Sequence, residues 1–173
     1  NHDYLKKQID HTKQQILLVL GGPNKYYNYD KKSIQHIFEN LQSLAKKYDL
    51  QIILIPSMRT PISTIEYACE FFGEENIIIK NVDKKAYLSA LSIAKFLVVT
   101  CDSTSMISEA ALTGKPIYVA QIAPKRDDFR FRQFRDLFTK LNIIRNLEDK
   151  LEIWNYEKLD ETNRVANIIK KKI

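Results

Sequence analysis

The residues best suited to chemistry lie in one segment, residues 100–116, which has the sequence TCDSTSMISEAALTGKP. The part from Asp102 to Ser105 contains only residue types that favour the start of a helix. The first backbone N–H groups of a helix have no partner within it, so they can bind an anion. Glu109 lies within the first turns and can offer its carboxylate to hydroxyl groups of a ligand. The segment therefore predicts an anion-binding helix start with a carboxylate beside it.

A second such segment, residues 21–24, follows the apolar run 16–20. Gly21 and Gly22 are two of only four glycines, and a backbone without Cβ atoms can approach a phosphate closely. The pattern matches neither the dinucleotide fingerprint nor the phosphate-binding P-loop, and a simple tight turn explains it equally well. The next residues, KYYNY at 25–29, suit a sugar or a base, or else pack as a surface loop.

Two further loops follow predicted strands. The loop PSMRTP at 56–61 is stiffened by two prolines, and its Arg59 suits a diphosphate or a carboxylate. The alternative is a turn in which Ser57 or Thr60 caps the next helix while the guanidinium is solvated. The residues NVD at 81–83 can offer backbone groups to the edge of a base, or they form a plain helix-capping turn.

The segment DDFRFRQFR at 127–135 combines arginines with aromatic residues, a composition also found in nucleic-acid-binding segments. Helical spacing, however, predicts one core face made of Phe131, Phe134, Leu137, Phe138 and Leu141. This favours a packed helix over a nucleic-acid partner. The basic residues would then border the site or a domain interface; they are Arg126, Arg130, Arg132 and Arg135.

Other chemistries find little support. A serine hydrolase is excluded in that chain order, because no Gly-x-Ser-x-Gly motif is present and no histidine follows His36. With two cysteines and three scattered histidines, we expect no metal site and no cofactor. Cys69 and Cys101 are expected to be reduced thiols of a cytosolic protein.

Composition bounds the function classes. The 173 residues, with 45% hydrophobic and 28% charged residues, suit one soluble domain with a real core. No apolar run approaches the roughly 20 residues that span a bilayer, and the polar start is unlike a secretory signal. Because the first residue is Asn1, we expect a piece of a longer protein. The net charge of +6 suits an anionic partner: a phosphate ligand, a nucleic acid or an acidic membrane.

Short apolar runs alternate with helical patterns along the chain. Strands are predicted at 16–20, 51–55, 76–80, 96–100 and 116–120. Helices are predicted at 30–48, 62–72, 83–94, 104–113 and 129–141. Residues 1–14 are expected to be a linker or arm, 143–158 irregular, and 159–172 a terminal helix, with the domain covering 15–173.

Strands that are apolar on both faces and alternate with helices predict an α/β fold with a parallel sheet between two helical layers. Right-handed crossovers favour a Rossmann-like, doubly wound order of 3-2-1-4-5. Ligands of such sheets bind outside the carboxyl ends of the strands, where the order reverses. The loops 21–29 and 101–105 are expected at this switch point.

The motifs GGP at 21–23, SMRTP at 57–61, DSTSMISEA at 102–110 and GKP at 114–116 together resemble a known family. Their succession is similar to the carboxyl-terminal half of a GT-B glycosyltransferase, such as the enzyme that adds N-acetylglucosamine to the peptidoglycan lipid precursor. More specifically, they resemble the bacterial and plant "mitochondrial fission, elongated mitochondria" family. Met58 departs from that family's usual Ser-Arg-Arg-Thr pattern.

The resemblance implies a site that binds the nucleotide-sugar donor. Glu109 would accept the ribose hydroxyl groups, and Asn81 and Val82 would lie beside the base. Gly22 and the helix start at 105–106 would lie beside the diphosphate, with help from Arg59. With the loop residues, the full predicted set is Gly21, Gly22, Asn24, Arg59, Asn81, Val82, Asp102, Ser103, Ser105, Met106 and Glu109.

We therefore expect the donor-binding half of a GT-B-type, metal-independent glycosyltransferase-like protein. The resemblance places the acceptor site and the general base in the other half, so this chain alone is not expected to be catalytic. Two alternatives stay open: a non-catalytic scaffold of the fission family, and an enzyme resembling a nucleotide-sugar epimerase. Expected partners are a nucleotide-sugar or nucleoside diphosphate, the other half, and an acceptor at a membrane surface. The expected location is the cytoplasm, with a peripheral position at a membrane as an open alternative.

Overall fold

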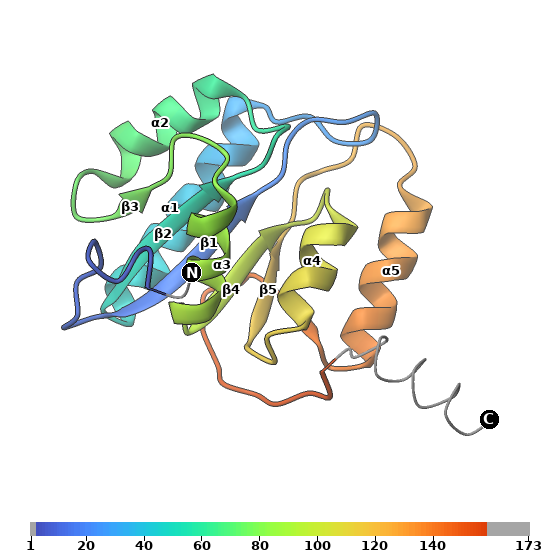
Figure 1. Ribbon diagram of the computed structural model, residues 1–173. Coiled ribbons are helices and arrows are strands. Elements are labelled where there is room, and N and C mark those ends of the chain that lie inside the picture. Colours follow the sequence, from blue (N-terminus) through green and yellow to red (C-terminus); the bar gives the residue numbers. More distant parts are fainter. Residues whose placement is uncertain (1–2, 159–173) are drawn as a thin grey trace, which may run out of the picture.

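The computed structural model describes residues 3–158 as one parallel sheet with helices on both faces (Figure 1). The strand order is β3-β2-β1-β4-β5-β6. The predicted doubly wound, Rossmann-like α/β fold is therefore confirmed, with β6 added at the edge beside β5. The strands are β1 (Gln14–Leu20), β2 (Leu50–Pro56), β3 (Ile77–Ile78), β4 (Phe96–Thr100), β5 (Ile117–Ala120) and β6 (Ile144–Asn146).

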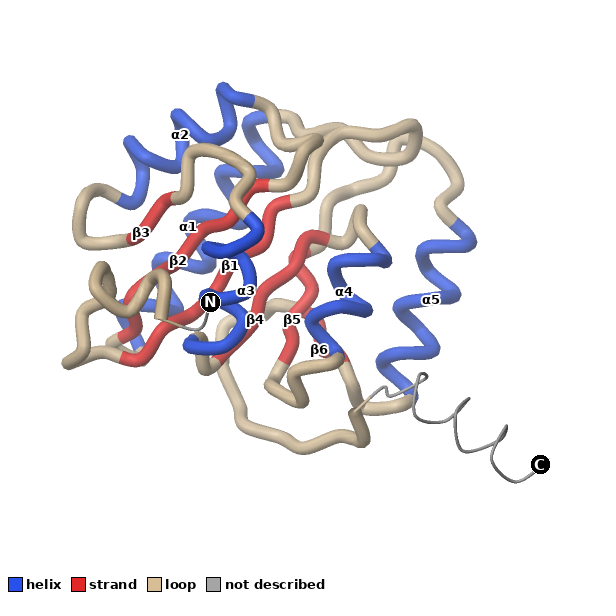
Figure 2. Tube along the Cα trace, in the orientation of Figure 1, coloured by secondary structure: helices blue, strands red, loops and turns tan. Residues whose placement is uncertain are grey.

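Helices join successive strands. They are α1 (Lys31–Lys47), α2 (Ile62–Phe72), α3 (Lys84–Ile93), α4 (Thr104–Ala111) and α5 (Phe129–Lys140). In Figure 2, α3 and α4 lie in front of the sheet, α1 lies behind it, and α5 stands beyond β5 and β6. None of the described helices is long and apolar enough to cross a membrane.

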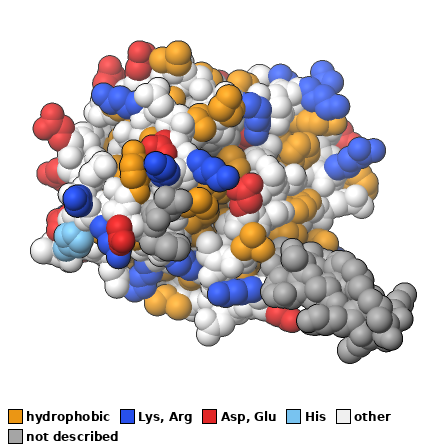
Figure 3. Space-filling model, viewed as in Figure 1, with side chains coloured by type: hydrophobic (Ala, Val, Ile, Leu, Met, Phe, Trp, Pro, Cys, Tyr) orange, Lys and Arg blue, Asp and Glu red, His pale blue; other side chains and the backbone are white. Residues whose placement is uncertain are grey.

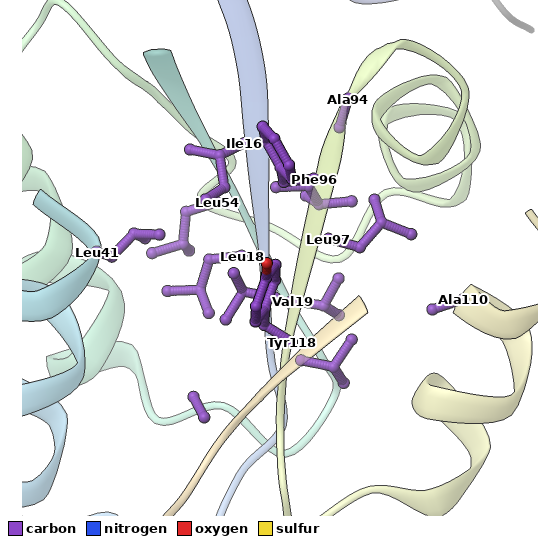
Figure 4. Packing of buried hydrophobic residues seen from close by; sticks show 14 of the residues in the cluster. Ile16, Leu18, Val19, Leu41, Leu54, Ala94, Phe96, Leu97, Ala110 and Tyr118 are labelled. Carbon is purple, nitrogen blue, oxygen red and sulfur yellow. The ribbon is translucent and has the colours of Figure 1, made fainter. Parts of the chain in front are cut away.

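The core lies between the two helical layers. All seven residues of β2 and the last six of β1 are buried, because helices cover both faces of these central strands. Figure 4 shows Leu18, Val19 and Leu97 at the centre of this packing, with Leu41 and Ala110 approaching from helices on either side. The rigid sheet fixes the positions of the loops that follow its strands.

The amino-terminal segment packs on the domain from residue 3 onward. The Leu5 side chain is fully buried, and its backbone N–H donates to Ser89 Oγ over 3.0 Å. The Tyr4 hydroxyl donates to Asp83 Oδ2 over 2.9 Å, at the start of α3.

The strand predicted at 76–80 is present but shorter, because β3 covers only Ile77–Ile78. Asn76 instead uses its side chain, whose Oδ1 accepts from the Ile52 N–H over 2.8 Å. The irregular structure predicted for 143–158 was wrong for Ile144–Asn146, which form β6, a strand too short for periodicity to reveal. The predicted terminal helix 159–172 lies outside the described residues.

Residues 147–158 form a strap that returns from β6 across the domain toward α4. The Glu152 N–H donates to the Tyr118 hydroxyl over 2.7 Å, and Trp154 Nε1 donates to the Asn142 carbonyl over 2.8 Å. The Tyr156 hydroxyl donates to the Lys115 carbonyl over 2.9 Å. Trp154 is 7% exposed and its ring packs edge-on against Tyr118. The strap is therefore part of the folded domain.

The buried Trp154 lets this packing be tested. Trp154→Ala should lower the free energy of unfolding by about 3–5 kcal/mol, because it empties a large buried site. Urea denaturation followed by circular dichroism is the measurement, since Trp154 is the only tryptophan and the variant would lose its fluorescence. The neighbouring Ile153 is 67% exposed, so Ile153→Ala should change stability by less than about 0.5 kcal/mol. Equal effects of the two variants would contradict a packed strap.

Candidate functional site

The sheet order reverses between β1 and β4, and the loops after these strands lie side by side at the carboxyl edge, as predicted. The Gly21 N–H donates to Thr100 Oγ1 over 2.8 Å. The Tyr29 hydroxyl lies 2.8 Å from the same oxygen and 2.6 Å from Asp102 Oδ1. The last residue of β4 therefore anchors both ends of the loop that follows β1.

Asp102 is only 2% exposed, and its carboxylate joins three loops. Its Oδ2 accepts from the Gly22 N–H over 3.0 Å and forms an ion pair with Arg59 Nη2 over 2.9 Å. Arg59 Nη1 also donates to the Gly22 carbonyl over 2.6 Å. Three of the predicted ligand-binding residues are thus brought together, but they bind one another in this structure.

The two glycines are required by this close packing, although neither has a positive φ. A Cβ on Gly21 would lie 2.1 Å from Asp102 Oδ2, and a Cβ on Gly22 would lie 2.0 Å from the Arg59 carbonyl oxygen. The glycine pair therefore makes room for the neighbouring loops.

The loop after β2 does not supply a side-chain cap to α2, contrary to one alternative. Thr60 Oγ1 lies 3.0 Å from the Leu20 carbonyl and also contacts that of Gly21. The backbone N–H of Ser57 donates to the Leu20 carbonyl over 2.9 Å. The N-cap residue of α2 is Pro61, which has no side-chain acceptor, and Thr60 is engaged with the end of β1.

Helix α4 begins at the switch point. Ser103 is its N-cap, and its Oγ accepts from the Met106 N–H over 3.4 Å and lies 3.2 Å from Ser105 Oγ. Asn24 Nδ2 reaches the Asp102 carbonyl over 3.4 Å. Ser105 is exposed at the helix start, where the positive end of the helix dipole can meet an anion.

A cavity of about 910 Å³ lies between α3 and α4, floored by Val19 and Ile55. Figure 3 views the molecule from this side, where hydrophobic, basic and acidic side chains meet. Of the predicted site residues, three line the cavity: Val82, Met106 and Glu109. The other eight do not line it; they are Gly21, Gly22, Asn24, Arg59, Asn81, Asp102, Ser103 and Ser105.

The mixed lining of the cavity suits an amphipathic ligand. Its apolar walls include Met58, Leu88, Leu91 and Leu112 besides the residues already named. Asp83, at the mouth, caps α3 by accepting from the Lys85 and Ala86 N–H groups over 2.8 and 3.1 Å. The turn at 81–83 is therefore a helix cap, and Val82 still contributes to the cavity wall.

Glu109 is exposed within the cavity and has one partner that sequence reasoning missed. The Tyr87 hydroxyl donates to Glu109 Oε2 over 2.9 Å, which joins α3 to α4 across the cavity. Burial, with the adjacent Glu109, raises the pKa of Tyr87 well above its usual range, so Tyr87 stays a hydrogen-bond donor at neutral pH. In the sequence, Tyr87 lies inside the predicted helix 83–94, and only its hydroxyl group indicates a polar contact.

Three lysines of the cavity wall were also missed. Lys115 Nζ donates to the carbonyls of Leu91 and Ala94, each over 2.7 Å, and so caps the end of α3. Lys84 lies at the mouth of the cavity, and Lys158 reaches its far end from the strap, crossing over Gly114. No periodic signal marks residues that a loop or a strap brings to a site.

A second buried ion-pair cluster supports the switch point from the side of α5. Arg135 Nη2 pairs with Asp128 Oδ2 over 3.0 Å, and Arg135 Nη1 donates to the Cys101 carbonyl over 3.2 Å. Tyr27 donates a short hydrogen bond to Asp128. Burial alone would raise the pKa of Asp128, but the Tyr27 hydrogen bond and the Arg135 and Arg132 guanidinium groups together hold it below its usual range. This cluster fixes the loop after β1 against α5.

No group of three or more His, Cys, Asp or Glu residues in the described range 3–158 is placed to hold a metal ion. The geometry offers instead a helix start and an apolar cavity with two carboxylates, the helix cap Asp83 and the exposed Glu109.

Known proteins resemble this chain in sequence and in fold. A family model described as mitochondrial fission ELM1 matches residues 1–173. The chain belongs to this family. It is 31% identical over 179 residues to the uncharacterized protein RP120 of Rickettsia prowazekii, covering 96% of this chain and 49% of that protein. It is 26% identical to the mitochondrial fission protein ELM1 of Arabidopsis thaliana, covering 91% of this chain and 38% of the relative. The chain thus spans half or less of these relatives.

Solved structures share the fold. S. aureus MnaA, solved with UDP, matches with a TM-score of 0.57 and 15% identity, covering 85% of this chain and 40% of the other. UDP-GlcNAc 2-epimerase from Neisseria meningitidis, bound to UDP-GlcNAc, matches with a TM-score of 0.54 and 13% identity, covering 98% and 39%. The domain therefore has the fold of half of a GT-B type protein.

The glycine contacts predict a strong effect of one added methyl group. Gly21→Ala should destabilise the fold by about 3 kcal/mol, because the Cβ overlaps the buried Asp102 carboxylate. Gly73→Ala shows the effect of backbone strain without overlap: no atom lies within 4 Å of the added Cβ, but φ +68° and ψ −174° form a conformation that only glycine adopts readily, so a loss of about 1–3 kcal/mol is expected there. Urea denaturation measures both. A Gly21→Ala variant as stable as the wild type would contradict the packing described.

The lowered pKa of Asp128 predicts a pH-dependent variant effect. At pH 7, Asp128→Asn should lower the free energy of unfolding by about 3 kcal/mol, since the two arginines lose their buried partner. The Asp128 contribution is fully present above the unfolded pKa of about 4 and is lost as pH falls through the lower folded value. The difference in free energy of unfolding between the wild type and Asp128→Asn should therefore become smaller as the pH falls below about 4.

The control for this experiment is Asp136→Asn, on the exposed side of α5. Its effect on stability should stay small at every pH, as expected for a surface substitution. Denaturation curves at a series of pH values give the free energy of unfolding of each variant. If the difference between wild type and Asp128→Asn does not change with pH, the lowered pKa of Asp128 is refuted.

Proposed function

We propose that this chain is the donor-binding half of a GT-B-type protein and binds a nucleoside diphosphate or its sugar at the carboxyl edge of the sheet. The observation that carries the proposal is the position of Glu109: its carboxylate lies in an apolar cavity whose wall is the first part of α4. The fold neighbours were solved with UDP or UDP-GlcNAc, which supports this ligand class.

The proposed ligand would use the two polar features separately. Glu109 Oε2 is taken by Tyr87, which leaves Oε1 to accept a ribose hydroxyl group. The base would lie against the apolar side chains of Val82 and Met106. The diphosphate would meet the backbone N–H groups at the start of α4 and the exposed Ser105 hydroxyl. Lys84, at the cavity mouth, adds a positive charge.

Arg59 and Asp102 would act mainly by holding the loops in place. Their ion pair leaves little net charge at the switch point, so the helix start would carry most of the attraction for a diphosphate. Arg59 has 39% of its side chain exposed, and N–H groups beyond the two already bonded can face a ligand. Gly22 would contribute by allowing the loop to lie close to Asp102.

Chemistry on the sugar is proposed only for the longer protein. The lining of the described cavity has two carboxylates, Asp83 and Glu109, and no histidine, and Asp83 is engaged in capping α3. The chain spans half or less of its relatives. Glycosyl transfer to an acceptor and epimerisation of the sugar would both need this half to bind the nucleotide-sugar. A scaffold role without nucleotide binding is favoured only by family membership. A cytoplasmic location, and an acceptor at a membrane surface, are part of this proposal.

A nucleotide titration tests the proposal. Among UDP, GDP, ADP and CMP, the chain should bind one preferentially, as measured by isothermal titration calorimetry. Glu109→Gln should weaken that binding about tenfold to a hundredfold, because a hydrogen bond to a charged group contributes about 1.5–3 kcal/mol. Glu66→Gln, an exposed carboxylate on α2, is the matched control and should leave the affinity unchanged. Absence of binding to all four nucleotides at millimolar concentration, or equal affinity of Glu109→Gln, would favour the scaffold alternative.

A further inference from the structure

Helix α5 carries a feature that the candidate site does not use. Phe129, Leu137 and Leu141 are 54%, 52% and 50% exposed. Helical spacing predicted the two leucines in the core, and this was wrong. Of that predicted face, Phe138 is buried and Phe131 and Phe134 pack partly buried against the core, because α5 lies at the edge of the sheet beside the short strand β6. Exposed large apolar side chains need an explanation when they share one face.

Leu137 and Leu141 are four residues apart and lie one turn apart on one side of the helix. Phe129 lies eight residues before Leu137, about 12 Å away along the axis, with the exposed Gln133 between them, so the three residues span about 18 Å at 1.5 Å per residue. We call them the α5 stripe. Figure 1 shows α5 as the outermost labelled element beyond β5. The exposed side chains of the stripe therefore lie on the outside of the described domain.

Cations lie at both ends of the α5 stripe. Arg126 and Arg130 are exposed near Phe129, and Lys140 is exposed next to Leu141. None of these three forms an ion pair within the described residues. The other arginines of the helix are neutralised: Arg132 pairs with Asp127 over 2.7 Å, and Arg135 pairs with Asp128. Apart from Asp136, the exposed charge along the stripe is thus positive.

We infer that the α5 stripe docks the protein on an anionic lipid surface. A helix lying in a membrane interface presents apolar side chains to the acyl region and basic side chains to the headgroups, as this helix does. A nucleic acid would use the cations, but it would gain little from two exposed leucines.

Docking through α5 would bring the candidate nucleotide site close to the lipid. Phe129 directly follows Asp128, which binds Tyr27 in the loop after β1. Lys125, just before the helix, donates its backbone N–H to the Tyr26 carbonyl over 2.8 Å. The start of α5 is therefore fixed to the same carboxyl edge where the nucleotide is proposed to bind. The inference about lipid does not depend on that proposal, because the stripe needs no nucleotide.

Vesicle flotation with the full chain tests the inference. The chain should bind vesicles of phosphatidylcholine mixed with phosphatidylglycerol, and bind pure phosphatidylcholine vesicles much more weakly. Leu137→Gln with Leu141→Gln should weaken binding by about tenfold or more, because two apolar side chains no longer enter the interface. Arg130→Gln should weaken it about fivefold at low salt and less at high salt.

Matched controls remove the same side chains elsewhere on the surface. Ile62→Gln removes an apolar side chain of α2 that is 74% exposed, and Lys32→Gln removes an exposed cation of α1. Both should bind anionic vesicles like the wild type. Circular dichroism and the nucleotide titration verify that the α5 variants keep the fold and the other site.

Three results would overturn the inference. They are no binding to anionic vesicles, equal binding to neutral vesicles, and control variants that weaken binding as much as the α5 variants do. The first would leave a protein partner as the occupant of the stripe. The nucleotide titration has a separate readout, so failure of lipid docking and failure of nucleotide binding can be told apart.

Discussion

The Asp102 carboxylate is buried between the end of β4 and the start of α4. A buried charge needs hydrogen-bond or ion-pair partners within the protein, because an unpaired charge away from water is strongly unfavourable. The partners of Asp102 are the Gly22 N–H, the Arg59 guanidinium and the Tyr29 hydroxyl. These partners come from the loops after β1 and β2, so one side chain joins three loops at the carboxyl edge. Gly21 has no side chain because Asp102 occupies that space.

This arrangement shapes what the site can do. The ion pair at the switch point uses its charges internally, and the ligand-facing features lie to one side, between α3 and α4. There the helix start, the apolar walls and Glu109 form a surface that suits the ribose, base and diphosphate of a nucleotide. The Tyr87 hydrogen bond holds Glu109 across the cavity. Loops held by these buried contacts around an amphipathic cavity support the proposed nucleotide site.

The same edge connects to α5 through a second buried cluster, Asp128 with Tyr27 and Arg135. One side of α5 is used to fix the loop after β1, and the other exposes the α5 stripe. The ELM1 family match identifies the chain's relatives, and the UDP-bound fold neighbours show the shared architecture. Neither comparison explains why a helix at the sheet edge should present leucines to solvent; lipid docking does.

Local pattern determined much of this protein. Apolar runs such as 16–20 and 51–55 specified buried parallel strands, and their alternation with helices specified the sheet order and the switch point. Only the tertiary structure decided which polar residues face a ligand. Arg59 looks free in sequence but closes on Asp102, while Tyr87 looks like core but reaches Glu109. The physical reason is that periodicity reports which face of an element is buried, whereas an ion pair or a cavity depends on residues that meet only after distant elements pack.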